Sequence, residues 1–193
     1  MQKGTERVQR LRVNYWESVR DLNVENLIFI DESGVNLAMT RSHARSPQGQ
    51  RAYSPVSKAG SNVSLIGAMS LNQVMTQVAL RGAVNTLTFE AFIHQRLIPM
   101  LWKGACIILD NCSIHFSHDM KQWIEDAGAH LIYLPPYSPE FSPIENCWSK
   151  VKSILRREKA QSYDELNQAL DLAFQSVSKK DIKACFFHCH CCT

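Results

Sequence analysis

Three short apolar runs mark the chain: Leu27–Ile30 ("LIFI"), residues 104–109 ("GACIIL") and residues 129–134 ("AHLIYL"). None alternates regularly between apolar and polar residues, as a strand with one face in water would. Strands without alternation are covered on both faces, which is typical of the centre of a sheet with parallel neighbours. We therefore expect the first two runs to lie side by side and parallel at the centre of a sheet.

The rest of the pattern predicts two more strands and a set of helices. Residues 62–70 and 74–82 form two apolar-rich stretches separated by only three residues, which predicts a hairpin. Apolar residues at helical spacing indicate helices at about 5–23, 86–101, 117–127, 143–158 and 162–177. This order predicts an α/β fold, a mixed five-stranded sheet with helices on both faces.

Composition indicates the size of the folded unit and the cellular compartment of the protein. The chain has 193 residues, of which 45% are hydrophobic and 20% charged, as in one folded domain with a short arm. No apolar run approaches the roughly 18 residues that cross a membrane, and the N-terminus lacks the apolar core of a signal peptide. Seven scattered cysteines, among them Cys106, Cys112 and Cys147, favour reduced, buried thiols. We expect a soluble, intracellular protein without a membrane partner.

Charge is unevenly distributed, although the net charge is only +3. No acidic residue occurs between Glu32 and Glu90, and this stretch carries several arginines and a lysine. A second basic cluster, "KVKSILRREK", spans residues 150–159. Clusters of this kind suit a phosphate backbone, but a solvated surface explains either one alone equally well.

Two of the apolar runs end in an acid, Asp31 and Asp110. Ligand sites of such sheets lie at the carboxyl ends of the central strands, and neighbouring strands are about 5 Å apart. Two carboxylates so close repel each other unless a cation lies between them. Mg²⁺ is bound by carboxylates, water and substrate phosphate, and a pair of such ions can cleave a phosphodiester.

A third acid, Glu145, has two interpretations. Ser142 and Glu145 fit the S-x-x-E pattern of a capping box, with Pro143 at the first helical position, so Glu145 is a helix cap on one interpretation. On the other it joins the metal site from the edge of the apolar stripe of its helix. Basic residues follow it along one flank, Lys152 at i+7 and Arg156 at i+11.

The segments "FIDESG", "LDNCSIH" and "YLPPYSPEFSPIENCWSKVK" resemble the catalytic region of DDE transposases of bacterial insertion sequences, in the group related to the mariner elements. The resemblance covers about residues 5 to 190, and the 34 residues between Asp110 and Glu145 match the spacing of that group. It implies a ribonuclease H-like fold, with an N-terminal helical arm or linker at 1–24 and the catalytic domain at 25–193.

The resemblance also implies a chemistry. Asp31, Asp110 and Glu145 would be the catalytic, metal-binding triad, holding two Mg²⁺ ions for which Mn²⁺ can substitute. The reaction would be cleavage of DNA at transposon ends and strand transfer into target DNA, by a homodimer in the bacterial cytoplasm, associated with the nucleoid.

Further residues match the family pattern in supporting positions. Asn111 and His115 would orient Asp110 or touch a phosphate, although a histidine after a strand is more often structural. Glu32 would point away from Asp31 because side chains alternate along a strand, which favours a supporting or surface role. Trp148 is expected in the core. DNA contacts are expected from Arg41, Arg45, Arg51, Lys152 and Arg156.

Two departures from the family keep other functions open. About 25 residues precede "LIFID", too few for the helix-turn-helix domains of full-length relatives, so a separately encoded DNA-binding half is one expectation. An inactive DNA-binding remnant of a transposase is the alternative function, and a phosphotransfer domain is a third that leaves Glu145 without a role. The C-terminal "FFHCHCCT" suggests zinc, but adjacent ligands on an extended tail do not easily close a tetrahedral site.

Overall fold

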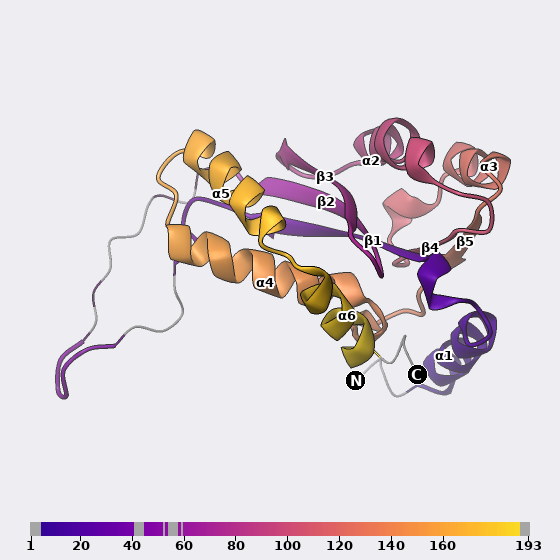
Figure 1. Ribbon diagram of the computed structural model, residues 1–193, viewed down its shortest axis with the longest axis horizontal. Coiled ribbons are helices and arrows are strands. Elements are labelled where there is room, and N and C mark those ends of the chain that lie inside the picture. Colours follow the sequence, from indigo (N-terminus) through magenta and orange to yellow (C-terminus); the bar gives the residue numbers. More distant parts are fainter. Residues whose placement is uncertain (1–4, 41–44, 52, 54–57, 59, 190–193) are drawn as a thin grey trace.

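The computed structural model describes residues 5–40, 45–51, 53, 58 and 60–189, and a five-stranded sheet forms its centre (Figure 1). Its strands are β1 (Leu27–Val35), β2 (Val63–Ser70), β3 (Val74–Arg81), β4 (Cys106–Leu109) and β5 (His130–Tyr133), in the order β3-β2-β1-β4-β5. The β1–β2 and β2–β3 pairs are antiparallel, whereas β1–β4 and β4–β5 are parallel. The mixed five-stranded sheet, the hairpin and the parallel neighbours at its centre are thus confirmed.

Strand β1 extends further than its apolar run predicted. Its parallel pairing with β4 covers only Leu27–Phe29, but its antiparallel pairing with β2 continues to Val35 and places Asp31 opposite Gly67. Asp31 therefore lies inside a strand, and the prediction that it ends one is wrong. Because the pairing of β1 with β4 stops two residues earlier, Asp31 still lies at the carboxyl end of the parallel pair.

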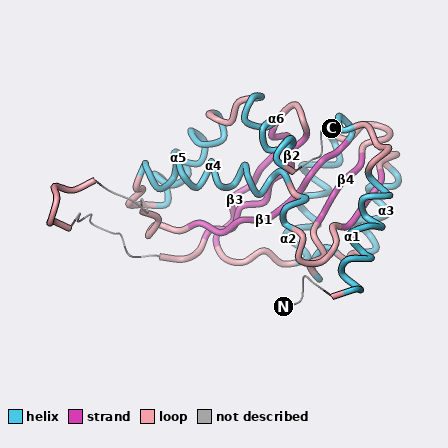
Figure 2. The backbone as a smooth tube through the Cα atoms, turned by 90° about the horizontal axis from the view of Figure 1, so that it is seen from below, coloured by secondary structure: helices cyan, strands magenta, loops and turns pink. Residues whose placement is uncertain are grey.

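Helices cover both faces of the sheet, as predicted (Figures 1 and 2). One face carries α4 (Pro143–Glu158), α5 (Tyr163–Gln175) and α6 (Lys179–His188), and the other carries α2 (Thr86–Phe92) and α3 (His118–Asp126). Alternate residues of β1 enter the two cores: Phe29 packs on the α4 side, whereas Ile28 and Ile30 pack on the α2 side. An uninterrupted apolar run is what this double burial requires.

Two helical segments differ from the expectation. The predicted helix at 86–101 is α-helical only to Phe92, and it continues as a π turn (Ile93–Leu97) and a 3-10 turn (Ile98–Met100). Pro99 has no backbone N–H for an α-helical bond at this point. Helix α6 was not predicted, because its pattern is short: only Ile182 and Phe186 are buried within it.

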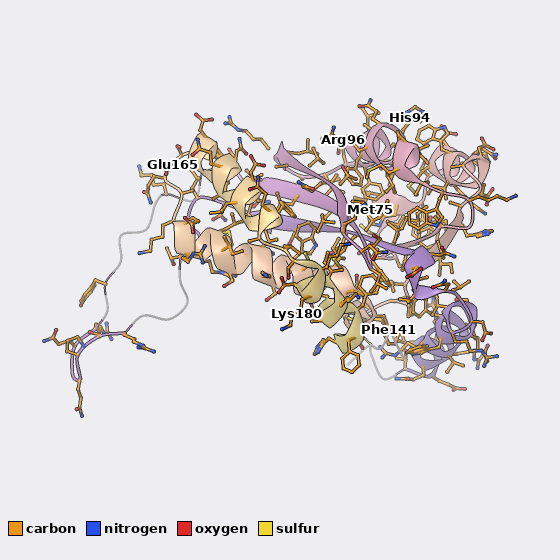
Figure 3. The ribbon with its side chains drawn as sticks, viewed as in Figure 1. Met75, His94, Arg96, Phe141, Glu165 and Lys180 are labelled. Carbon is orange, nitrogen blue, oxygen red and sulfur yellow. The ribbon has the colours of Figure 1, made fainter. Side chains whose placement is uncertain are left out.

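Helix α1 (Glu6–Val19) packs against the turn that leads into α4. Tyr15 stacks on Phe141 with ring centroids 5.5 Å apart, and the Arg12 guanidinium lies 2.7 Å from the Glu140 carboxylate. Phe141 is labelled in Figure 3 on the side of the molecule that faces α1. The N-terminal helix thus packs against the residues that precede α4. The division of the chain into an arm at 1–24 and a domain at 25–193 stays a prediction.

The cysteine expectation is only partly right. Cys106 and Cys147 are buried thiols, but Cys112 is exposed, because it follows the end of β4 instead of lying within an apolar element. Within the described ranges, no helix is both long and apolar enough to cross a membrane.

Candidate active site

Three acids from distant parts of the chain line one cavity of about 430 Å³. Asp31 comes from β1, Asp110 directly follows β4, and Glu145 lies in the first turn of α4. The segment Leu134–Pro139, which contains three prolines, forms another wall. The three predicted acids therefore line one cavity, and their joint role in metal binding stays a prediction.

Glu145 does not act as the predicted helix cap. Ser142 is the N-cap residue, but its side chain makes no capping hydrogen bond, and its backbone N–H donates to the carbonyl oxygen of Pro139. The Glu145 residue is exposed and lines the cavity. The capping-box interpretation is wrong, since neither half of the reciprocal bonding is formed.

Asp31 lies in a strongly acidic environment. Burial, followed by the negative charges of Glu145, Glu32 and Asp110, raises the pKa of its carboxyl to about 8. Two buried acids this close to other negative charges would share a proton if no cation were bound. A bound divalent cation instead favours the ionised carboxylates. The donor set, with several carboxylates around an open cavity, fits a hard cation such as Mg²⁺.

The carboxylates are not yet arranged as ligands. Among the described residues, no group of three or more His, Cys, Asp or Glu side chains is close enough together to hold a metal ion.

His115 links Asp110 to Glu32. Its Nδ1 lies 2.7 Å from Asp110 Oδ1, and its Nε2 lies 2.8 Å from Glu32 Oε1. Burial alone would lower the pKa of His115, but the hydrogen bonds to Asp110 and Glu32 outweigh it and raise the pKa to about 10. The hydrogen bond from His115 in turn lowers the pKa of Asp110. The protonated ring therefore donates to both acids.

Glu32, and not Asp31, reaches His115 because the two acids point to opposite faces of the sheet. Glu32 follows Asp31 in β1, so the two side chains point to opposite faces. Glu32 reaches His115, which is fully buried and packs against Phe89 with ring centroids 4.3 Å apart. Glu32 and His115 thus support Asp110 from the α2 side. Asn111 is exposed and lines the main cavity beside Asp110.

One polar contact was missed at the sequence level. Trp148 is buried, as expected, but its indole Nε1–H also donates a hydrogen bond to Asp31 Oδ2 at 3.0 Å. Its position one turn after Glu145, on a helix expected to reach the metal site, was the available signal. Sequence alone does not show which strand residue the indole meets.

A second cavity, of about 370 Å³, is also lined by the two aspartates. Asp31 and Asp110 line both cavities, and Glu32, Gly34 and Asn62 line only the second. An extended ligand can therefore approach the aspartates from two directions.

The predicted DNA-contacting residues fall into two places. Arg45 and Arg51 are exposed in the connection between β1 and β2, where both views show residues 45–51 away from the sheet (Figures 1 and 2). Arg41 lies outside the described residues. Lys152 and Arg156 are half-buried on α4, about 10 Å and 16 Å along the helix from Glu145.

The C-terminal zinc hypothesis is untested. His188 ends α6 and Cys189 follows it, with the Asn146 amide 3.5 Å from the Cys189 sulfur. His190, Cys191 and Cys192 lie outside the described residues.

Comparison with known proteins gives a family match over most of the chain. The family model described as DDE superfamily endonuclease matches residues 26–167. The Tc1 transposase of Caenorhabditis elegans is 25% identical over 162 residues, covering 78% of this chain and 59% of the relative. The Tcb1 transposase of Caenorhabditis briggsae is 24% identical over 164 residues, covering 79% and 60%. The chain thus spans about 60% of the length of these relatives.

Solved structures of Mos1 transposase share the fold. A paired-end complex with the left transposon end superposes with a TM-score of 0.77 at 17% identity, over 95% of this chain and 59% of that one. The Mos1 catalytic domain with raltegravir and Mg gives a TM-score of 0.70 at 15% identity, over 95% and 90%. This likeness confirms the ribonuclease H-like fold that the sequence predicted.

Proposed function

The chain belongs to the DDE superfamily endonuclease family, and from that membership we propose that it is the catalytic domain of a DNA transposase. It would cleave DNA strands at transposon ends and transfer them into target DNA. One observation carries the proposal: Asp31, Asp110 and Glu145 come from three distant parts of the chain and line the same cavity.

Each of the three acids has a defined role in this proposal. Asp31, Asp110 and Glu145 would hold a divalent cation pair, Mg²⁺ or Mn²⁺, which supplies an activated water and stabilises the oxygen that leaves the phosphate. The clustering of acids around the cavity supports cation binding. Without a cation, burial and the neighbouring carboxylates raise the pKa of Asp31 to about 8. Solved Mos1 structures with Mg and with Mn support the choice of ions.

DNA would pass the aspartates along the two cavities that they share. The basic flank of α4, Lys152 and Arg156, would hold the phosphate backbone beyond Glu145. Arg45 and Arg51, together with Arg41, would contact DNA from the connection between β1 and β2. A chain of positive groups leading away from an acidic metal site suits a polyanion that is cut at one phosphate.

Partners and origin belong to the same proposal. A homodimer that binds transposon ends and target DNA is supported by the paired-end and strand-transfer complexes of Mos1. We also propose a separately encoded DNA-binding half as a partner. We propose a bacterial insertion-sequence origin and a cytoplasmic, nucleoid-associated location from the motif resemblance, although the matched relatives named above are from nematodes.

Nicking of supercoiled plasmid DNA in Mg²⁺ or Mn²⁺ tests the proposed activity. Asp31→Ala, Asp110→Ala and Glu145→Ala should each reduce metal-dependent nicking at least about 100-fold, because each removes a ligand. The melting temperature of Glu145→Ala should stay near that of the wild type, since no capping hydrogen bond is removed.

Asp164→Ala is the matched control, because Asp164 is an exposed acid in the first turn of α5 and does not line the cavity. It should nick plasmid DNA like the wild type. A folded wild-type protein that binds DNA but never nicks it would favour the inactive remnant instead. Full nicking by Glu145→Ala would remove Glu145 from the chemistry.

A further inference from the structure

The indole N–H, which is the only polar group of the Trp148 side chain, donates a hydrogen bond to a proposed metal ligand, Asp31. The ring is 2% exposed, its Nε1–H donates to Asp31 Oδ2 at 3.0 Å, and it packs edge-on against Phe174 of α5. A buried indole N–H needs an acceptor, but many acceptors would serve. Here the acceptor is the carboxylate of Asp31, one of the three proposed metal-binding acids.

Gly67 provides the space for this contact. It pairs with Asp31 across β1 and β2, so both residues face the α4 side of the sheet. A Cβ atom at Gly67 would lie 2.8 Å from Cη2 and 3.1 Å from Cζ2 of Trp148, too close for either group to stay in place. The indole ring therefore occupies the place where the side chain of residue 67 would be.

The same helix carries Trp148 and Glu145. The two residues are three positions apart in α4, so they lie on neighbouring parts of one helix face. The hydrogen bond from Trp148 to Asp31 thus joins the element that carries Glu145 to the strand that carries Asp31. Any rotation or slide of α4 that moves Glu145 must also strain or break this bond.

We propose that Trp148 is a positioning residue, which fixes the Asp31 carboxylate and the placement of α4, and that Gly67 is required to admit its ring. The inference rests on the proposed function, because it assigns a purpose to the geometry of the metal-binding acids. Trp148 touches neither DNA nor metal in this proposal. It acts through Asp31 and through the helix that bears Glu145.

Metal affinity and the indole resonances test this without relying on activity. The chain has four tryptophans, so its ¹H–¹⁵N spectrum contains four indole signals, which single Trp→Phe variants assign. The Trp148 signal should shift in Asp31→Asn and during titration with Mg²⁺. Calorimetry with Mn²⁺ should show about 10-fold weaker binding for Trp148→Phe, the size typical of removing a partner of a metal ligand.

Two further variants make the test specific. Trp102→Phe removes another indole hydrogen bond, from Trp102 to Asn26 at 3.1 Å, which lies before β1 and outside the cavity, so Mn²⁺ affinity should not change. Gly67→Ala keeps Trp148 but displaces its ring, and it should weaken Mn²⁺ binding like Trp148→Phe. If Trp148→Phe does not fold, Gly67→Ala and the wild-type indole spectra decide the question.

Outcomes separate this inference from the proposed function. Equal Mn²⁺ affinity of wild type, Trp148→Phe and Gly67→Ala, or a Trp148 signal unmoved by Asp31→Asn, would overturn the positioning role while nicking by the wild type upheld the function. A wild type that neither binds Mn²⁺ nor nicks DNA would overturn both.

Discussion

His115 shows how much one residue's role depends on partners that are distant in sequence. Its position five residues after Asp110 was visible in the motif, and its Nδ1 lies 2.7 Å from Asp110 Oδ1. Glu32, its second partner, is 83 residues away in the chain. No local pattern could show that both ring nitrogens are occupied by carboxylates.

Replacing His115 should therefore affect stability as well as the site. His115→Ala leaves Glu32 and Asp110 without their shared cation next to the apolar ring of Phe89. Because these acid side chains are 20% and 50% exposed, losing their hydrogen bonds to the cation should cost about 2 kcal/mol. Urea denaturation should show this decrease in unfolding free energy, together with slower plasmid nicking.

His118→Ala is the control for this prediction, because the His118 side chain is 90% exposed. Its unfolding free energy should stay within about 0.5 kcal/mol of the wild type. If His115→Ala unfolded at the wild-type urea concentration, the ring would not be acting as a shared cation.

At the scale of elements, the apolar pattern located all five strands and nearly all their ends, but it missed the end of β1. Residues 31–35 of β1, "DESGV", are mostly polar and include a glycine, and only the antiparallel pairing with β2 keeps them in a strand. The irregular end of α2 and the short helix α6 were missed for similar reasons. Tertiary packing decides these boundaries, and the sequence pattern does not contain it.

In the proposed function, helix α4 carries both the metal-binding Glu145 and the DNA-binding residues Lys152 and Arg156. The second role is tested by removing the two basic side chains. Lys152→Ala combined with Arg156→Ala should weaken DNA binding uniformly across sequences, because side chains that bind phosphate carry no sequence information. The slope of log K against log salt should flatten by about 2, roughly 0.9 for each phosphate that is no longer neutralised. Fluorescence anisotropy over a salt series measures both quantities.

A double variant on the exposed surface of α6, Lys180→Ala with Lys183→Ala, removes the same charge from a helix that carries none of the proposed DNA-contacting residues. This control should leave the slope unchanged. An unchanged slope for the α4 variant as well would exclude its flank from the DNA interface.

At the scale of the molecule, the sheet brings distant acids together by its strand order. Placing β1 beside β4 brings Asp31 and Asp110 to one cavity, and α4, in the helix layer on one face, adds Glu145 to its lining. The sequence was sufficient for the fold class, and the motif resemblance named the three acids that line the cavity. It was not sufficient for Trp148 and Gly67, whose contact exists only once α4 packs on the sheet.

The central claim is that Asp31, Asp110 and Glu145 bind divalent cations together. Anomalous diffraction from crystals soaked in Mn²⁺ tests it most directly, and repeating the soak with Glu145→Ala gives the matched comparison. We predict anomalous peaks in the cavity at about 2 Å from oxygens of all three side chains, weakened in the Glu145→Ala crystals. A fully soaked crystal without a peak there, or with one held only by residues outside this triad, would contradict the claim.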